Sequence, residues 1–364
     1  MNTSNIKFSR KDQKKFFRTL NSRVNSYFRD NNIKRTGNWQ LWIKTIIMFL
    51  IFLVPYFLIL TLELTGWAQL LFTVVMGIGM AGVGMNVMHD GNHGSFSSKS
   101  WVNNLMGSSI YILAGNVYNW KVQHNVLHHT YTNVHGHDED LDAGRILRFT
   151  KHAQWRWYHK FQHYYSVLLY GLLTINWAIT TDFLQMKRYM KRQLAYGKLP
   201  SATKNWSTLV ISKIIYLSMW ILIPMLILDM AWWKILLGFF IMHYTAGLIL
   251  SIIFQLAHVM DDAEMPIPDE NGTLKNTWAI HQLKTTINFS PKNKLINWFT
   301  GGLNHQVEHH IFPNISHIHY GKIAEIVKKT AQEFNLPYNE YKTTRKAIIA
   351  HFRYLKHMGV KPAL

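Results

Sequence analysis

The chain contains no cysteine among its 364 residues. This absence excludes disulfide bonds, zinc sites built from thiolates, and iron–sulfur clusters held by the chain itself. Acidic residues are also scarce, since 19 Asp and Glu stand against 39 Lys and Arg, which gives a formal net charge of +20. A basic chain can bind nucleic acid, but that class of protein leaves the long uncharged runs described next unexplained. We therefore expect no nucleic-acid partner.

Charged residues are absent from four long apolar runs, two of which are 23 residues long. Because a helix that crosses a bilayer needs about 20 apolar residues, we predict an all-α membrane protein whose four transmembrane helices form two hairpins. The run at 214–228 is shorter, and a span there requires Lys213 to extend its side chain to the membrane interface. We interpret the uncharged run 166–181 as an interfacial segment. The four predicted spans are Thr45–Leu62, Gly66–Met88, Ile214–Leu228 and Ile235–Ala257.

The basic residues are concentrated in three parts of the chain. Residues 1–44 carry 11 Lys and Arg, residues 89–207 carry 13 and residues 258–364 carry 13, whereas the short connections within the two hairpins carry none. Loops rich in Lys and Arg stay on the cytoplasmic side of a membrane. We therefore expect a multi-pass protein of a bacterial inner membrane, with both termini and the active site facing the cytoplasm.

The same pattern predicts three domains. Residues 1–44 form a cytoplasmic N-terminal arm. Residues 45–258 form the transmembrane and interfacial helices and carry the first two histidine clusters. Residues 259–364 form a helical cytoplasmic cap that carries the third cluster.

Histidine is abundant, and eight of the 20 histidines form three clusters beside the predicted spans. Imidazole is the commonest metal ligand among side chains. Two histidines four residues apart share one face of an α-helix, while His129 would be turned about 100° from His128, toward a second ion. Eight ligands exceed the three that a catalytic zinc takes, so we predict two ions, and nitrogen ligands without thiolate favour iron for oxygen chemistry. The clusters are His89 and His93; His124, His128 and His129; and His305, His309 and His310.

The clusters and spans together resemble the membrane fatty acid desaturase family over most of the chain. The segment 301–313, GGLNHQVEHHIFP, is similar to the third histidine box of front-end acyl desaturases, where Gln replaces the first His. The resemblance implies a di-iron enzyme that uses dioxygen to remove two hydrogens from a fatty acyl chain carried by coenzyme A or a lipid. It also implies an additional ligand at the end of the last span, where His258 stands. The expected metal ligands are His89, His93, His124, His128, His129, His258, His309 and His310, with His305 as a possible further one.

The first ligand of the third box has two candidates. Spacing favours His305, which stands four residues before His309 as His124 stands before His128. The resemblance favours Gln306, which occupies the box's first-ligand position. Both alternatives stay open at this point.

Other polar residues near the clusters receive supporting roles. His243 lies in the middle of the last span, where we expect it to make a hydrogen bond between helices instead of binding metal. Carboxylates beside the clusters can orient imidazoles by accepting a hydrogen bond from the ring nitrogen that does not bind metal. The candidates are Asp90, Asp138, Asp140, Asp261, Asp262 and Glu308.

An unactivated methylene has no acidic proton, so its oxidation requires a cofactor and not only acid–base side chains. Two electrons per turnover would come from a separate donor of the ferredoxin or cytochrome b5 type, because no heme-binding or flavin-binding segment is evident. Two other functions stay open: a hydroxylase of the same architecture, and a metal transporter. A transporter places its ligands near the bilayer midplane, whereas these clusters lie at the ends of the spans.

Overall fold

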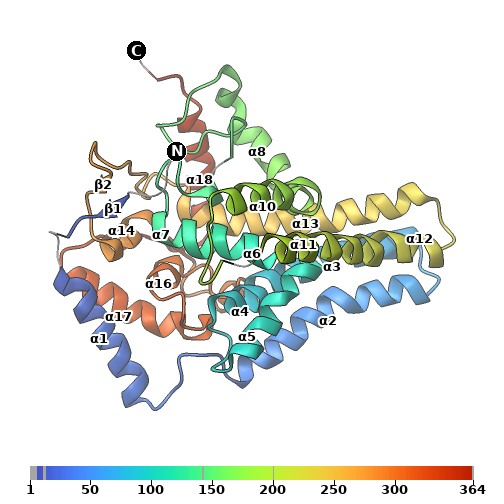
Figure 1. The fold of residues 1–364 in the computed structure, drawn as a ribbon, viewed down its shortest axis with the longest axis horizontal. Coiled ribbons are helices and arrows are strands. Elements are labelled where there is room, and N and C mark those ends of the chain that lie inside the picture. Colours follow the sequence, from blue (N-terminus) through green and yellow to red (C-terminus); the bar gives the residue numbers. More distant parts are fainter. Residues whose placement is uncertain (1–5, 11–13, 142, 200, 363–364) are drawn as a thin grey trace. The chain divides into compact units, whose positions relative to one another are not determined.

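The long uncharged runs of the sequence form long helices (Figure 1). The structure, a computed structural model, describes residues 6–10, 14–141, 143–199 and 201–362. Within these residues the four strands contain two residues each and the rest of the regular structure is helical, so the all-α prediction is confirmed. The chain divides into two compact units, which are described separately: unit 1 comprises Met1–Gly37, Gln123–Ser166 and Ile253–Leu364, and unit 2 comprises Asn38–Val122 and Val167–Ile252.

Among the described residues, four helices are long and apolar enough to cross a membrane. Each matches one of the runs predicted to span, to within one residue at the C-terminal end of the run, so the prediction of four transmembrane helices is confirmed. Asn38, Thr65 and Ser201 begin three of these helices, because each side chain accepts a hydrogen bond from a backbone N–H of the first turn. The candidate spans are Trp39–Thr61, Gly66–His93, Ala202–Ile227 and Trp232–His258.

Unit 2 also contains the short helices between the spans. The interfacial run at 166–181 lies within two helical segments, Trp157–Tyr170 and Leu173–Lys191, which meet at a bend of 66°. Its interfacial placement stays a prediction.

The elements of unit 2 are α2 (Trp39–Thr61), α3 (Gly66–Val83), η2 (Gly84–Met88), α4 (His89–His93), α5 (Ser100–Gly107), η3 (Ser108–Leu113), α6 (Val117–Trp120), α9 (Leu173–Asn176), η7 (Trp177–Thr181), α10 (Asp182–Lys191), α11 (Ala202–Leu217), η8 (Ser218–Leu222) and α12 (Ile223–Ile227). Three further elements, η4 (Lys121–His128), α8 (Gln162–Tyr170) and α13 (Trp232–His258), belong partly to each unit.

Glycines let α3 approach its neighbours closely. A Cβ atom at Gly77 would lie 2.6 Å from the carbonyl oxygen of Met242 in α13, and one at Gly79 would lie 2.5 Å from the backbone nitrogen of Phe52 in α2. Real Cβ atoms do not approach other atoms this closely, so both positions require glycine. Small residues serve the same purpose at other helix contacts in lipid.

The structure corrects the prediction for Lys213. We expected this side chain to reach the membrane interface, but it is only 5% exposed. Its Nζ lies 2.7 Å from Oδ2 of Asp182 in α10, so the lysine is buried as an ion pair within unit 2. A charged group in lipid is stable when a partner of opposite charge is available inside the protein. The sequence could not show that Asp182 is that partner.

Unit 1 has its own hydrophobic core. Helix α1 (Lys14–Asp30) buries Phe16, Leu20 and Val24 against α17 and neighbouring elements, at the spacing of one helix face. The segment predicted as the N-terminal arm thus contains a helix that packs into the core of unit 1. The remaining elements of unit 1 are α7 (His129–Tyr131), η5 (Glu139–Leu141), η6 (Trp157–Phe161), α14 (Trp278–Thr285), α15 (Lys294–Phe299), α16 (Gln306–Ile311), η9 (His317–His319), α17 (Tyr320–Glu333) and α18 (Thr344–Met358), with two parallel pairs of strands, β1 (Lys7–Phe8) with β2 (Thr273–Leu274) and β3 (Asn288–Phe289) with β4 (Glu340–Tyr341).

Candidate metal centre

The second histidine cluster lies on a π-helix instead of the α-helix we assumed. Segment η4 (Lys121–His128) is π-helical, and His129 begins α7. In a π-helix the backbone bonds join residues five apart, so residues i and i+5 approach one another. The Nε2 atoms of His124 and His129 are accordingly 3.3 Å apart. His129 therefore lies beside His124, while His128 and His129 belong to different groups of converging nitrogens. The expectation that His129 serves a second ion stays a prediction.

Two carboxylates hold the rings of the second cluster. Nδ1 of His128 lies 2.9 Å from Oδ2 of Asp138, and Nδ1 of His124 lies 2.8 Å from Oδ2 of Asp140. Asp138 also accepts a hydrogen bond of 2.8 Å from the backbone N–H of Asn133, which fixes the carboxylate itself. Carboxylates accept only, so each imidazole donates through Nδ1 and directs Nε2 away from the carboxylate. Both acids were among the predicted orienting residues.

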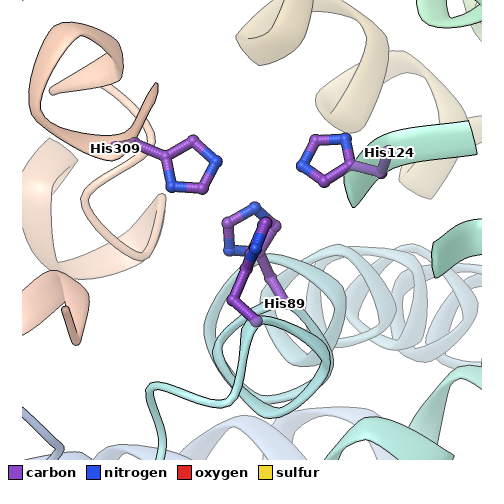
Figure 2. A group of neighbouring side chains, drawn as sticks. His89, His124 and His309 are labelled. Atoms are coloured by element: carbon purple, nitrogen blue, oxygen red, sulfur yellow. The ribbon is translucent and has the colours of Figure 1, made fainter. Parts of the chain in front are cut away.

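Helix α16 carries His309 and His310, and both side chains are fully buried. Nδ1 of His310 lies 2.9 Å from Oε1 of Gln282 in α14, and Nδ1 of His309 lies 3.1 Å from the hydroxyl of Tyr320 in α17. Figure 2 shows the rings of His124 and His309 extending toward each other, with centroids 6.0 Å apart. The third cluster is thus oriented by side chains from two other helices.

His258 ends α13 and faces the same cluster. Its Nδ1 lies 3.3 Å from the backbone carbonyl oxygen of Thr285, and its ring centroid lies 4.8 Å from that of His128 and 4.9 Å from that of His310. Because a carbonyl only accepts, His258 also donates through Nδ1 and leaves Nε2 with a lone pair.

Three buried nitrogens converge in unit 1 with no hydrogen-bond partner: Nε2 of His128, of His258 and of His310. One ring nitrogen from each of these residues lies within 4.8 Å of the others. Buried polar atoms without a partner are rare in folded proteins and call for an explanation. A metal ion explains all three at once, since imidazole binds metal through one nitrogen while the other donates to an orienting acceptor. The side chains therefore fit a metal ion.

Further groups of potential ligands lie beside this one in unit 1. One group is formed by His129, His309 and His310, whose ring nitrogens lie within 4.8 Å of one another. The other consists of a ring nitrogen from each of His124 and His128 and a carboxylate oxygen of Asp140, again within 4.8 Å of one another. The groups share His128 and His310, so the site is one continuous cluster with more nitrogen ligands than one ion takes.

Burial and charge set the protonation of the cluster. The pKa of His310 is held well below its ordinary value, first by burial and then by the neighbouring imidazoles of His129 and His128. Burial also lowers the pKa of His128, but the charges of Asp138 and Asp140 outweigh burial and raise it overall. Neutral His310 thus offers a lone pair, and the two carboxylates stabilise positive charge beside His128.

The first cluster belongs to unit 2. The π-helical segment η2 leads into α4, where the ring centroids of His89 and His93 are 4.5 Å apart. The indole of Trp120 stands edge-on to both rings, with centroids 5.8 Å and 5.4 Å away. Figure 2 labels His89 on α4. The first cluster is therefore a preformed pair of imidazoles with an aromatic wall.

His305 lies outside the groups of converging nitrogens. It immediately precedes α16, so the argument that it shares a helix face with His309 does not hold. Both ring nitrogens are buried without a hydrogen-bond partner, and Nδ1 is 3.6 Å from Oε2 of Glu308. Its role as a ligand stays a prediction.

The other predicted supporting residues divide into two kinds. His243 makes the expected bonds between helices, with Nε2 2.6 Å from the hydroxyl of Tyr216 and Nδ1 2.9 Å from Oγ1 of Thr174. Asp262, in contrast, accepts a hydrogen bond from the hydroxyl of Tyr341 at 2.6 Å. Glu308 accepts hydrogen bonds from Tyr338 and Asn288.

Sequence reasoning missed the orienting residues that are distant along the chain. Gln282 lies 28 residues from His310, and Thr132, whose Oγ1 is 3.2 Å from Nδ1 of His310, lies 178 residues away. No spacing in the sequence marks either residue. Asp138 could be found because it lies only 10 residues from His128.

Comparison of the sequence with known proteins identifies the family to which the chain belongs. Residues 65–342 match the family described as fatty acid desaturase. The chain is 37% identical over 348 residues to the sn-1 linoleoyl-lipid 6-desaturase of Arthrospira platensis, covering 95% of this chain and 93% of that protein. It is 34% identical to the sn-1 linoleoyl-lipid 6-desaturase of a Synechocystis strain, covering 97% of this chain and 98% of that protein.

Relatives from eukaryotes match over nearly the same part of the chain. The acyl-lipid (8-3)-desaturase of Physcomitrium patens is 32% identical over 358 residues, which cover 98% of this chain and 74% of that protein. The family match, the relatives and the buried histidine cluster agree with one another. The chain therefore belongs to the fatty acid desaturase family and is a membrane-bound fatty acyl desaturase, an oxidoreductase of lipid metabolism.

Proposed function

We propose that this desaturase acts at a centre of two iron ions, on acyl chains carried by membrane lipids, with dioxygen as the co-substrate. The observation that carries the proposal is the convergence of three buried Nε2 atoms without a partner, on His128, His258 and His310. Bound iron would supply the oxidising power that allows dioxygen to remove two hydrogens from an unactivated pair of methylenes. Nitrogen ligands without thiolate suit iron in this role.

The proposed ligand set is the one predicted from the sequence. It comprises the first pair, the three histidines of the second cluster, two histidines of the third cluster and His258. His305 is retained as a possible further ligand. The proposed ligands are His89, His93, His124, His128, His129, His258, His309 and His310.

The protein's own part in the reaction is to orient and to exclude water. Asp138, Asp140 and Gln282 fix the imidazole rings by accepting hydrogen bonds from Nδ1. The burial of the cluster keeps bulk water from the reacting carbon atoms, which strengthens electrostatic interactions within the site. Two electrons per turnover would come from a separate carrier of the ferredoxin or cytochrome b5 type.

We further propose a lipid-linked substrate and a new double bond at position 6. The Arthrospira and Synechocystis relatives are named as lipid 6-desaturases, and their sequences are more nearly identical to this chain than that of the (8-3)-desaturase is. The active site would face the cytoplasm of a bacterial inner membrane, because the Lys and Arg residues lie on that side of the predicted topology.

Lipid analysis of a host that expresses the chain tests this proposal. Wild type should produce an acyl chain with two hydrogens fewer than its precursor, and His128→Ala should produce none. His351→Ala is the matched control, since His351 is also buried but donates to the carbonyl of Val259 outside the cluster. Equal product from His128→Ala and wild type would refute a role for the cluster. Adduct mass spectrometry then locates the double bond, and a position other than 6 would refute only that part of the proposal.

A further inference from the structure

In the buried ion pair of unit 2, the ammonium group of Lys213 uses all three of its hydrogen-bond donors. Nζ of Lys213 donates to Oδ2 of Asp182 and to the carbonyl oxygen of Trp177, both at 2.7 Å, and to the carbonyl oxygen of Ala114. An ammonium group has three donors, and here each has an acceptor. The other carboxylate oxygen of Asp182 lies 3.0 Å from Nδ2 of Asn119.

This network fastens the short helix α6 to α10, which the ion pair links in turn to α11 (Figure 1). Besides the carboxylate, Asn119 donates to the backbone carbonyl of Asp182 at 2.7 Å. The hydroxyl of Tyr118, the preceding residue, donates at 2.7 Å to the carbonyl of Leu194 just beyond α10. Helix α6 continues directly into η4, and the side-chain hydrogen bonds of Tyr118 and Asn119 hold this start of the helix against α10 and the residues that follow it.

The same ion pair holds the turn that leads into α6. Ala114 has φ of 70°, in the left-handed region that non-glycine residues seldom occupy. The ammonium group of Lys213 stabilises this turn by donating a hydrogen bond to the Ala114 carbonyl. The turn and the helix that follows it are thus both attached to one pair of charges.

Helix α6 ends at Trp120, which forms the wall beside the first histidine pair. The indole stands at 81° to the ring of His89 and at 76° to that of His93. A displacement of α6 would move the indole, and the two imidazoles would gain freedom to turn. Asn119, adjacent to Trp120 in the chain, is completely buried in its contacts with Asp182.

We propose that the Asp182–Lys213 ion pair is a clamp that positions α6 and, through Trp120, orients His89 and His93. Asp182, Lys213 and Asn119 are then positioning residues of the desaturase. The inference rests on the proposed function, because it takes His89 and His93 as metal ligands. A buried ion pair is a poor source of net stability, since the loss of hydration offsets the attraction, but it can specify one arrangement of the elements around it.

Two variants of the full-length chain separate this role from ordinary packing. Asn119→Leu removes the hydrogen bonds between α6 and Asp182 and leaves the ion pair intact. Tyr216→Phe is the matched control, because it removes a buried hydrogen bond to His243 from the same helix as Lys213 without touching α6. The first measurement is the NMR spectrum of ¹⁵N-labelled histidine in metal-free protein. Asn119→Leu should shift the signals of His89 and His93, and Tyr216→Phe should not.

The second measurement is a titration with Co²⁺, followed by the visible absorption of the bound ion. We expect wild type and Tyr216→Phe to bind two Co²⁺ ions, and Asn119→Leu to bind one of them at least 10-fold more weakly. The double variant Asp182→Asn, Lys213→Met should behave like Asn119→Leu.

The outcomes keep the two proposals apart. Unchanged signals of His89 and His93 in Asn119→Leu would overturn the clamp, whether or not metal binds. Failure of wild type to bind Co²⁺ would count against the proposed metal centre, while a shift of the two signals would still support the clamp. If the double variant does not fold, Asn119→Leu decides alone, because it retains both charges.

Discussion

At the scale of single residues, the metal centre depends on which nitrogen of each imidazole is engaged. Asp138, Gln282 and the carbonyl of Thr285 each take the Nδ1 hydrogen of one histidine. The tautomer is therefore set before any ion arrives, and Nε2 is the atom that can bind metal. Residues that never touch the ion thus decide where the ligand atoms point.

Asp138→Asn tests this arrangement. The amide can still accept from His128 but carries no charge, so the imidazole becomes a weaker ligand. We expect metal affinity to fall about 10-fold to 100-fold, as is typical when an orienting partner of a ligand is altered. Competition between the protein and a coloured chelator measures the change. Asp262→Asn is the control, since Asp262 binds Tyr341, and equal affinities of the two variants would contradict the prediction.

His305→Ala tests the third box. Both nitrogens of His305 are buried without a hydrogen-bond partner, so we expect this residue to bind the metal or to lie within one hydrogen bond of it. Loss of the ring should remove about one iron per chain or most of the activity. His351→Ala again controls for the loss of a buried histidine. Iron content by mass spectrometry and turnover are the measurements.

The alternative ligand in the third box is Gln306. If Gln306 occupies the ligand position, Gln306→Ala should lower iron content and turnover more than His305→Ala does. Near-normal iron and turnover in His305→Ala would end the case for His305 and leave the desaturase assignment in place, since that assignment rests on the family match.

At the scale of elements, π-helical segments lead into the first cluster and carry two histidines of the second. Segment η2 leads into His89, and η4 contains His124 and His128. A wider helical turn brings residues five apart together, which an α-helix cannot do without bending. The pair His124 and His129 shows the result, with 3.3 Å between Nε2 atoms. The helix type therefore changes which histidines can share an ion.

Helix α10 offers a basic surface to the proposed electron donor. Lys187, Arg188 and Lys191 are exposed, and small acidic redox proteins associate with such surfaces at rates that depend on salt. Reversing all three charges to Glu should raise the apparent KM for the donor several-fold and weaken its dependence on ionic strength. Steady-state turnover at varied donor and salt concentrations gives both quantities.

A matched reversal on α18 and its approach controls for net charge. Lys342, Arg345 and Lys346 are also exposed, and their replacement by Glu should leave the KM for the donor unchanged. If the α10 variant shows unchanged donor kinetics, binding of anionic lipid headgroups is the better account of these residues.

At the scale of the whole molecule, topology is the open structural prediction. The distribution of basic residues predicts both termini on the cytoplasmic side and the two hairpin turns outside. Reporters fused after Gly66 and Met230 should therefore be active only outside the cytoplasm, and one fused after Leu364 only inside. A C-terminal reporter that is active outside would overturn the arrangement and the proposed cytoplasmic active site with it.

The sequence by itself determined the four membrane helices, the histidine clusters and the family. Hydropathy is a local property, since an uncharged run such as Gly66–Met88 has the same preference for lipid whatever surrounds it. The regular spacing of His124, His128 and His129 is likewise visible without a fold. The match to other desaturases adds to these local features and does not depend on how the helices pack.

Only the tertiary structure decided the partners of buried polar groups. Lys213 pairs with Asp182, 31 residues away, and His310 with Gln282, 28 residues away. A buried hydrogen-bond donor needs an acceptor, and the sequence offers many acceptors. The packing of distant segments decides which of them lies within reach. The π-helical path through His124 was decided in the same way, because an isolated segment has no reason to prefer the wider turn. The candidate ligands were therefore readable from the sequence, whereas the contacts that orient their rings required the fold.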